Sequence, residues 1–212
     1  MIAIIDYKAG NLTSVVKALR YLGAGSASSE DILITQDPEA VRRADRVILP
    51  GVGHFRSTQL LHELLLTEAI RDAIGPGTKR GVPFLGICVG LQWLYQGSTE
   101  ADTTDGLRHL ASRCERFPTH YNNAELKSPH VGWNSLENIR PDSRLLAGIE
   151  NGAFVYYTHS WRAPVSDATS ATTDYGGPFT AAVEQGNVMG VQFHPEKSAD
   201  TGLRILKNFL TL

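Results

Sequence analysis

The sequence predicts a single α/β domain over residues 1–212, with a mostly parallel central sheet flanked by helices and an added antiparallel portion. Three observations predict this class. Apolar strand-like runs alternate with helical patterns as far as about residue 97, which is the order of a parallel sheet with crossover helices. From about residue 98 the pattern changes to strands separated by polar segments. The 212 residues are 42% hydrophobic, enough for one full core.

The first elements follow from apolar spacing and from residues that end or begin helices. Residues 2–5 read as a buried strand, and apolar residues then recur at helical spacing from Leu12 to Leu22, with Gly23 as the predicted stop. Residues 32–35 form a short second strand. Asp37-Pro38-Glu39 predicts a helix start, because it combines a capping side chain, a proline at the first helical position and an acid in the first turn.

The next elements lead to the centre of the sheet. Val47-Ile48-Leu49 is a predicted third strand that closes on Pro50–Gly53, and one helical stretch is expected over 55–74 until Gly75-Pro76-Gly77 breaks it. The last predicted parts of this half are a strand over 84–87 and a helix to about Gln96. In such sheets ligands bind beyond the carboxyl ends of the strands. Asp6, Pro50–Gly53 and Cys88 all occupy such ends, so we expect one shared site there.

The second half of the chain has a less regular pattern. Residues 98–130 are polar and irregular, with short candidate strands. Longer strands are expected over 154–160 and 179–183, joined by a Ser/Thr/Asp/Gly/Pro-rich turn over 166–178. A strand over 188–193 leads to His194, and an amphipathic helix is expected over 199–210.

The segment Gly86-Ile87-Cys88-Val89-Gly90 places a cysteine between glycines directly after an apolar run. This is typical of a nucleophile elbow, where a buried strand turns sharply into a helix and exposes one side chain. The glycines leave room for the tight turn. A free thiol has a pKa of about 8.5, and a helix N-terminus and a nearby imidazole both favour the thiolate.

The segment His194-Pro195-Glu196 supplies a base and a carboxylate. Pro195 biases His194 toward an extended backbone, in which residues two apart point the same way, so Glu196 is predicted to lie beside the His194 ring. Cysteine, imidazole and carboxylate together form a thiol-based acyl-transfer site. Taken singly, Cys88 also fits a buried small hydrophobe, and the three residue types also fit zinc, although no second cysteine or histidine stands at ligand spacing.

Composition excludes several function classes. The formal net charge of −2 gives no nucleic-acid or membrane signature, and no apolar run approaches the ~20 residues of a membrane span. Two cysteines, Cys88 and Cys114, form no disulfide framework and suit a reducing compartment. With no basic leader at the N-terminus, a cytoplasmic location is expected.

These residues resemble the class I, or triad, glutamine amidotransferases, and more narrowly the glutaminase subunits of imidazole glycerol phosphate synthase, in a flavodoxin-like fold. The elbow and the His-Pro-Glu segment are shared across the wider class. Pro50–Gly53 and 129–134 point to the subfamily. The segments that match in order are Asp6-Tyr7 with Gly10-Asn11, Pro50-Gly51-Val52-Gly53, Gly86-Ile87-Cys88-Val89-Gly90-Leu91-Gln92, Pro129-His130-Val131-Gly132-Trp133-Asn134 and Gln192-Phe193-His194-Pro195-Glu196-Lys197-Ser198.

The resemblance implies that L-glutamine is hydrolysed to glutamate and ammonia through a thioester on Cys88. His194 protonates the departing ammonia and Glu196 orients His194, with no cofactor and no metal. The resemblance also implies an oxyanion hole, formed by the Val52 and Val89 amides with Gly51 and Gly53 beside Val52. It further implies that the side chains of Gln92, Ser160 and Trp161 bind glutamine. For Ser160 and Trp161 sheet packing is the alternative, and for Pro50–Gly53 a plain turn.

The resemblance also implies a (β/α)₈ cyclase partner in a one-to-one heterodimer, which uses the ammonia to make imidazole glycerol phosphate and an aminoimidazole carboxamide ribotide in histidine biosynthesis. The positions that match the expected interface are His130, Trp133, Asn134, Tyr156 and Lys197. The chain has no P-loop and no basic cluster for a bis-phosphate substrate, which fits this division of labour.

One position departs from the family pattern, and several alternatives stay open. Lys8 stands where the family start Asp-Tyr-Gly-x-Gly-Asn has glycine; a positive φ there costs about 1–2 kcal/mol, so the turn is expected to differ. The alternatives are the glutaminase subunit of anthranilate, aminodeoxychorismate or pyridoxal phosphate synthesis, a cysteine peptidase or glutamyl hydrolase, and a regulatory subunit without turnover.

Overall fold

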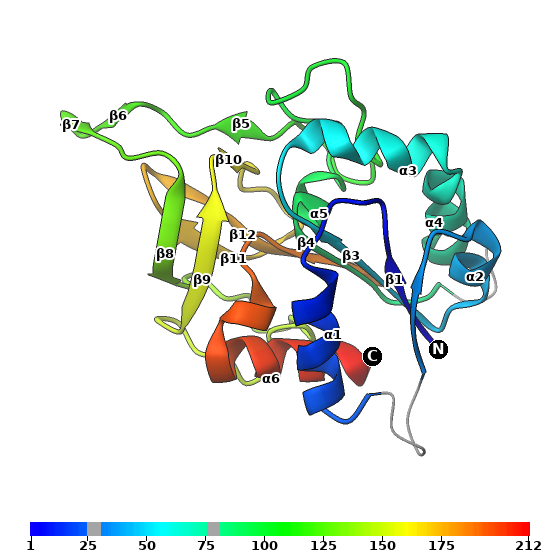
Figure 1. Ribbon diagram of the computed structural model, residues 1–212. Helices are drawn as coiled ribbons and strands as arrows, with labels where there is room; N and C mark the ends of the chain where they lie inside the picture. Colours follow the sequence, from blue (N-terminus) through cyan, green and yellow to red (C-terminus); the bar gives the residue numbers. More distant parts are fainter. Residues whose placement is uncertain (25–30, 76–80) are drawn as a thin grey trace.

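The computed structural model describes residues 1–24, 31–75 and 81–212. A seven-stranded sheet runs through the molecule in the order β11-β12-β13-β4-β3-β1-β2 (Figure 1). The five strands from β2 to β13 are parallel, and β12 and β11 extend the sheet antiparallel. The bounds of these strands are β1 Ile2–Ile5, β2 Ile32–Thr35, β3 Arg46–Gly51, β4 Phe84–Cys88, β11 Thr169–Asp174, β12 Pro178–Gln185 and β13 Val188–Val191.

Helices cover both faces of the sheet, as the alternating pattern predicts. Helices α1 and α6 pack together on one face, and α2 and α4 pack together on the other (Figure 1). Asp37 caps α2 by accepting a hydrogen bond from the Glu39 amide at 2.9 Å, with Pro38 at the first helical position. The bounds of the helices are α1 Leu12–Tyr21, α2 Pro38–Arg43, α3 Gln59–Glu63, α4 Leu66–Ile74, α5 Val89–Gln92 and α6 Ala199–Leu210, with 3₁₀ turns η1 Phe55–Thr58 and η2 Pro195–Lys197.

Short antiparallel pairs form beside the main sheet. Strand β8 (His130–Ser135) pairs with β9 (Phe154–His159), placing Trp133 opposite Tyr156. The remaining strands come from the irregular middle of the chain and pair as β5 with β10 and β6 with β7: β5 Glu115–Arg116, β6 His120–Tyr121, β7 Ala124–Glu125 and β10 Trp161–Arg162.

The single helix expected over 55–74 is wrong. The structure has η1, α3 and α4 there, and Leu65 between α3 and α4 has φ +59°. This left-handed residue ends one helix axis and starts another, so that Leu61 and Leu66 are both fully buried. The expected break at Pro76-Gly77 lies outside the described residues.

The helix after the elbow is shorter than the prediction to Gln96. Helix α5 ends at Gln92 because the following carbonyls bond to a later segment instead of continuing the helix. Leu107 donates to the Trp93 carbonyl at 2.6 Å, and Gly106 donates to the Gln96 carbonyl at 3.0 Å. The carbonyl acceptors that would extend the helix are therefore occupied.

The turn expected over 166–178 contains strand β11. Its threonines suit a strand because they are β-branched, and their hydroxyl groups find partners when buried. Thr173 donates to the Ser135 carbonyl at 2.7 Å, and Thr169 bonds to Thr180 at 2.8 Å. Strand β13 ends at Val191, two residues before the predicted end, and the Gln192 amide donates to the Ala181 carbonyl at 2.8 Å.

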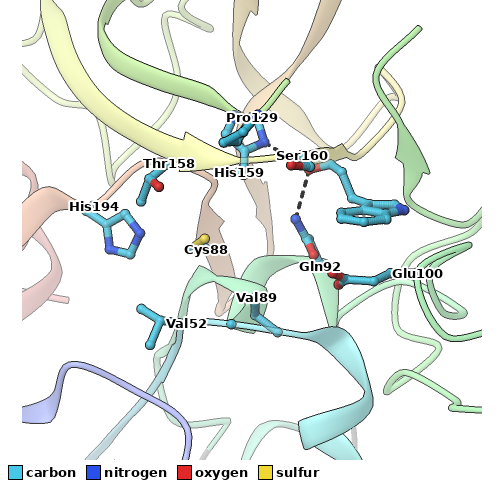
Figure 2. A pocket seen from close by; sticks show the side chains of 12 residues that line it. Val52, Cys88, Val89, Gln92, Glu100, Pro129, Thr158, His159, Ser160 and His194 are labelled. Carbon is cyan, nitrogen blue, oxygen red and sulfur yellow. Dashed lines mark hydrogen bonds between the residues drawn. The ribbon is translucent and has the colours of Figure 1, made fainter. Parts of the chain in front are cut away.

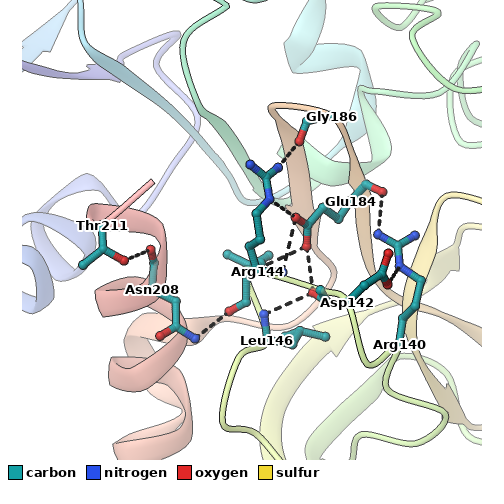
Figure 3. Close-up of polar contacts among 10 residues, drawn as sticks. Arg140, Asp142, Arg144, Leu146, Glu184, Gly186, Asn208 and Thr211 are labelled. Carbon is teal, nitrogen blue, oxygen red and sulfur yellow. Dashed lines mark hydrogen bonds and ion pairs between the residues drawn. The ribbon is translucent and has the colours of Figure 1, made fainter.

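A buried carboxylate fixes the loop after β8 to the sheet (Figure 3). Glu184 on β12 has a side chain only 4% exposed; it accepts from Ser143 Oγ at 2.7 Å and from Arg144 Nε at 2.8 Å. Asn208 on α6 donates to the Leu145 carbonyl at 2.9 Å. These bonds satisfy the buried charge and tie the loop to both the sheet and α6.

Candidate active site

Cys88 ends the central strand β4 and lies at the base of a cavity of about 280 Å³. Its φ of +54° lies in a region that a non-glycine residue rarely adopts, which is the strained geometry of a nucleophile elbow. Its side chain is 4% exposed, and the cavity reaches it (Figure 2). The predicted elbow is therefore present, although α5 has only four residues.

The two glycines of the elbow are required for close packing. A Cβ atom on Gly90 would lie 2.0 Å from the Leu49 carbonyl oxygen of β3, and one on Gly86 would lie 2.4 Å from the Gly90 carbonyl oxygen. Both distances are far inside van der Waals contact with backbone atoms, which cannot rotate away. The absence of side chains at both positions lets α5 sit directly against β3 and β4.

His194 lines the cavity, and Glu196 lies beside its ring. His194 Nδ1 and Glu196 Oε1 are 2.8 Å apart, and both side chains are only 1% exposed. The prediction that the two side chains meet is confirmed, but its geometric reason is wrong. His194 is extended, whereas residues 195–197 form the 3₁₀ turn η2, which brings Glu196 back to the ring.

The electrostatic environment of His194 favours its protonated form. Burial alone lowers the pKa of His194, but the Cys88 sulfur and the Glu196 carboxylate outweigh burial and raise that pKa to about 10. Among the described residues, none lies in hydrogen-bonding geometry with His194 Nε2. The His194 ring lies beside the Cys88 sulfur (Figure 2). The imidazolium form of His194 is thus favoured beside the Cys88 sulfur.

Two glutamines lie between α5 and the end of β13. Gln92 Nε2 donates to the Trp161 carbonyl at 2.9 Å and to Gln192 Oε1 at 3.1 Å, and Gln192 Nε2 lies 3.6 Å from Cys88 Sγ. Gln92, Ser160 and Trp161 line the cavity, as expected for positions that hold a ligand there.

The segment after β3 forms another wall. Val52 and Gly53 line the cavity together with Val89, and Gly51 pairs with Cys88 in the β3–β4 ladder. Gly53 has φ +89°. Four predicted positions are thus gathered where β3 and β4 end.

Four further residues that line the cavity are not among the predicted site residues. Glu100, Thr158, His159 and Pro129 also border the cavity, and Glu100 Oε2 accepts from the Phe55 amide at 2.8 Å. Glu100 lies in the polar, irregular stretch after α5, where no spacing or motif distinguishes it. Among the described residues, no group of three or more His, Cys, Asp or Glu side chains has the geometry of a metal site. Nor does any described helix have the length and apolar character needed to cross a bilayer.

Comparison with known proteins places this geometry in a family. The family described as glutamine amidotransferase class-I matches residues 3–212. The imidazole glycerol phosphate synthase subunit HisH of Caulobacter vibrioides is 45% identical over 212 residues, covering 99% of this chain and 97% of that protein. The HisH subunit of Methanothermobacter thermautotrophicus is 43% identical, covering 100% of this chain and 98% of its own. The chain belongs to the HisH family of class I glutamine amidotransferases.

Solved structures at low identity support the fold alone. A crystal structure described as a glutamine amidotransferase superposes with a TM-score of 0.73 at 17% identity, covering all of both chains. A chain from the structure of PurLQS of Thermotoga maritima superposes with a TM-score of 0.66 at 18% identity, covering 99% of this chain and 97% of its own. The fold class predicted from the sequence, and its resemblance to the HisH family, are confirmed.

The departure from the HisH pattern at Lys8 leaves the positive-φ turn in place. Lys8 has φ +62°, and its amide donates to Asp6 Oδ1 at 2.9 Å. Lys8 thus adopts the positive φ that costs a non-glycine residue about 1–2 kcal/mol. The aspartate satisfies the amide of the strained residue and holds the turn.

Most of the positions expected at a HisH interface form one exposed cluster. Trp133 is 52% exposed and contacts Tyr156 edge-on at 6.0 Å between centroids, and Lys197 Nζ lies 5.9 Å from the Tyr156 ring. Asn134 follows Trp133 on β8 and is half-buried; its side chain points to the opposite face of the strand, where it bonds to His130 and to the Asp174 carbonyl. His130 is different, because its side chain is 4% exposed. In this chain the His130 ring lies behind the surface, where its Nε2 is 3.3 Å from Asn134 Nδ2.

Two buried histidines predict an acid-sensitive fold in this HisH chain. Burial lowers the pKa of His130 to about 4 and that of His159 to about 3, against about 6.5 in the unfolded chain. Between pH 6.5 and 4 the unfolded state binds more protons, so the free energy of unfolding falls as pH decreases, by up to about 1.4 kcal/mol per pH unit for each histidine. The raised pKa of His194 changes the free energy of unfolding in a different pH range, above pH 6.5.

Urea unfolding at pH 7, 6 and 5 measures this slope. In His159→Phe we expect the free energy of unfolding to depend less steeply on pH, by the contribution of about one proton. His120→Asn, at an exposed histidine on β6, serves as the matched control and leaves the slope unchanged. Parallel profiles for the protein and His159→Phe contradict the prediction.

Proposed function

We propose that this chain is the glutaminase subunit of imidazole glycerol phosphate synthase. It hydrolyses L-glutamine to glutamate and ammonia and passes the ammonia to a (β/α)₈ cyclase partner in histidine biosynthesis. The observation that carries the proposal is the meeting of Cys88 with the His194–Glu196 pair at one cavity, in a chain that belongs to the HisH family. Cyclisation and its lyase chemistry belong to the partner, and a cytoplasmic location is part of the same proposal.

The proposed reaction is a two-step acyl transfer. The Cys88 thiolate attacks the side-chain amide carbon of glutamine and forms a tetrahedral oxyanion. His194, protonated at Nε2, gives its proton to the amide nitrogen, and ammonia leaves as the C–N bond breaks. Water then attacks the resulting glutamyl thioester, with His194 taking its proton, and glutamate departs from the regenerated thiolate. Glu196 holds the ring by its Nδ1 and stabilises the imidazolium.

The oxyanion requires amide donors at the ends of β3 and β4. The Val89 amide is one candidate because it directly follows the nucleophile, and the Val52 amide is the other because Val52 lines the same cavity. The glycines beside Val52, Gly51 and Gly53, permit its peptide plane to turn. Loss of one such donor typically costs about 2.7–4 kcal/mol of transition-state stabilisation.

We propose that glutamine is recognised at the wall of the cavity that lies across from His194 (Figure 2). Gln92, Ser160 and Trp161 border the space beside the sulfur, where the amino-acid end of glutamine fits. Glu100 adds the negative charge that suits the α-ammonium group of the substrate. These residues surround a cavity of about 280 Å³, sufficient for a small amino acid.

The partner is proposed to dock on the cluster of Trp133, Asn134, Tyr156 and Lys197. An exposed tryptophan beside a tyrosine and a lysine is typical of a docking anchor, and the lysine suits an acidic group on the partner. The cluster adjoins the catalytic residues, since His194 donates its amide to the Tyr156 carbonyl at 2.9 Å. Ammonia leaving Cys88 therefore has a short route to that face.

Glutamate release from L-glutamine, measured with and without the cyclase partner carrying its bound substrate, tests the proposal. We expect release to rise by about 10-fold or more when the loaded partner is present, which corresponds to a decrease of about 1.4 kcal/mol in activation free energy. Equal and robust release in both conditions contradicts the subunit role and favours a free-standing hydrolase. No release in either condition contradicts glutaminase activity.

A further inference from the structure

A continuous chain of buried hydrogen bonds links the half-buried Asn134 on β8 to the cysteine. Its two ends are joined through side chains from β8, β9, α5 and the ends of β4 and β13, and through one backbone carbonyl on β10. The successive distances are Asn134 Nδ2 to His130 Nε2 3.3 Å, His130 Nδ1 to His159 Nε2 3.1 Å, His159 Nδ1 to the Trp161 carbonyl 2.9 Å, Gln92 Nε2 to the same carbonyl 2.9 Å, Gln92 Nε2 to Gln192 Oε1 3.1 Å, and Gln192 Nε2 to Cys88 Sγ 3.6 Å.

The Trp161 carbonyl fixes the direction of every bond on the cysteine side. A carbonyl oxygen only accepts, so Gln92 must present its NH₂ group to it. The second proton of that NH₂ goes to Gln192 Oε1, which fixes the amide of Gln192 as well. The nitrogen of Gln192 is then the atom that faces Cys88, and it donates an N–H to the sulfur.

The same carbonyl fixes the direction on the other side. His159 must carry its proton on Nδ1, and because burial lowers its pKa the ring is neutral and Nε2 accepts. His130 therefore donates from Nδ1, and its own neutral Nε2 accepts from Asn134. Asn134 is held in this orientation because its other amide proton goes to the Asp174 carbonyl at 3.0 Å.

Packing keeps these side chains in one arrangement. Gln192 is fully buried, Gln92 is 3% exposed and His159 is 6% exposed. The His130 ring stacks on Tyr157 and Tyr175, with centroids 4.8 and 4.0 Å away. Buried polar groups are costly to leave unpaired, so breaking one bond of the chain disfavours the orientation of the next.

We propose that Gln192 is a positioning residue that holds an amide N–H on the Cys88 sulfur, and that His159 and His130 keep it in that orientation through the Trp161 carbonyl and Gln92. This rests on the proposed function for Cys88 as nucleophile. A hydrogen bond donated to sulfur stabilises the thiolate over the thiol. The chain also joins the nucleophile to Asn134, next to the exposed Trp133, so movement of β8 changes the hydrogen bonding at the sulfur.

The other groups that face the sulfur act separately from this chain. His194 and Glu196, which follow β13, form an ion pair of their own beside the sulfur. Tyr7, after β1, is neutral in the assay range because burial and Cys88 raise its pKa. Glu100 borders the same cavity from the loop after α5. None of these four residues hydrogen-bonds to Gln192 within the described ranges 1–24, 31–75 and 81–212, so a change at Gln192 leaves their own contacts in place.

The test is the pH dependence of Cys88 alkylation by iodoacetamide, in a Cys114→Ala background so that one thiol reacts. Gln192→Glu keeps the shape and still accepts from Gln92 but offers no N–H to sulfur when ionised, and Gln192→Leu removes both bonds. We expect the midpoint of the alkylation profile to rise by about one pH unit in both variants, a tenfold lower thiolate fraction below the midpoint. If Gln192→Leu fails to fold, Gln192→Met decides, because methionine offers no N–H and adds no charge, whereas an ionised glutamate raises the midpoint by its charge as well.

The histidine part has its own pair of variants. His159→Asn places an amide N–H where Nδ1 stood and keeps the bond to Trp161, so its midpoint is expected to stay within about 0.3 pH units of the parent. His159→Phe loses that bond and is expected to shift upward, by less than Gln192→Glu. His120→Asn on β6 is the control and is expected to overlay the parent.

Unchanged midpoints in the folded Gln192 variants overturn the proposal. Equal midpoints for His159→Phe and His159→Asn overturn its histidine part. Alkylation requires neither glutamine nor partner, so its outcome is separate from that of the glutamate assay. A shifted midpoint in a chain that releases no glutamate leaves the positioning role standing and removes the proposed function; the reverse result removes only the positioning role.

Discussion

Replacing Cys88 with alanine is expected to lower glutamine-dependent glutamate release by about 10⁴-fold or more, because the acyl-enzyme step has no alternative nucleophile. The complex with the cyclase partner is expected to keep making product when free ammonia is supplied, since the partner's chemistry needs ammonia and not the thiol. The measurement is paired: glutamate release with glutamine, and cyclised product with an ammonium salt at a pH where part of it is unprotonated.

Cys114→Ala is the matched control for this substitution. Cys114 is fully buried, burial raises the pKa of its thiol, and its sulfur lies 3.9 Å from the Gln92 carbonyl. It does not line the cavity, so its removal is expected to leave glutamate release within a few-fold of the parent. Retained glutaminase activity in Cys88→Ala contradicts the assignment of the nucleophile. Loss of the ammonia-dependent reaction as well indicates that the substitution disrupts the complex.

Gly90→Ala is expected to be the most destabilising single methyl addition in the elbow. The new Cβ would lie 2.0 Å from the Leu49 carbonyl oxygen, so α5 must move away from β3 or the strand must shift. Overpacking of this kind typically costs about 1–3 kcal/mol, and a clash with the backbone of a central strand places it at or above the upper end. Urea unfolding followed by far-UV circular dichroism measures the loss.

Gly10→Ala gives the comparison. A Cβ at Gly10 meets its nearest atoms, Leu12 Cδ2 and the Pro50 carbonyl oxygen, at 3.4 Å, which is ordinary contact. We expect its free energy of unfolding to change by less than about 1 kcal/mol. Similar stabilities for Gly90→Ala and Gly10→Ala contradict the account of why the elbow needs glycine.

The parts of the fold that the sequence predicts correctly are those where local pattern and tertiary role agree. Strands β1, β3 and β4 are continuous apolar runs because both faces of the sheet are covered by helices. The cap at Asp37 works as its residue types predict. The elbow is recognisable because close packing against β3 restricts Gly86 and Gly90, and such sites leave a local signature.

The failures have a common physical cause in contacts that are distant in sequence. The early end of α5 depends on carbonyls of 93–96 bonding to residues 106–110, and nothing near Gln96 records this. Strand β11 is stabilised by pairing with β12 and by hydroxyl partners such as Ser135. The break at Leu65 falls inside a run of leucines whose apolar pattern is continuous.

The residues of the candidate site also divide into those that the sequence predicts and those that it does not. Cys88, His194 and Glu196 are predictable because a strained turn and a proline restrict short motifs. Glu100 is not distinguished by its neighbours, and the place of Gln192 at the start of the matched segment 192–198 does not reveal its contact with Cys88, because both roles depend on where the fold places these residues. His130 matches a family motif, but burial decides that it lies behind the proposed docking surface.

The measurement that tests the central claim most directly is covalent labelling with an electrophilic glutamine analogue, such as a glutamine chloroketone, followed by peptide mapping. We expect a single adduct on Cys88 that excess L-glutamine prevents and that forms much more slowly in His194→Ala. An adduct on Cys114, or no glutamine-protected adduct at all, contradicts it.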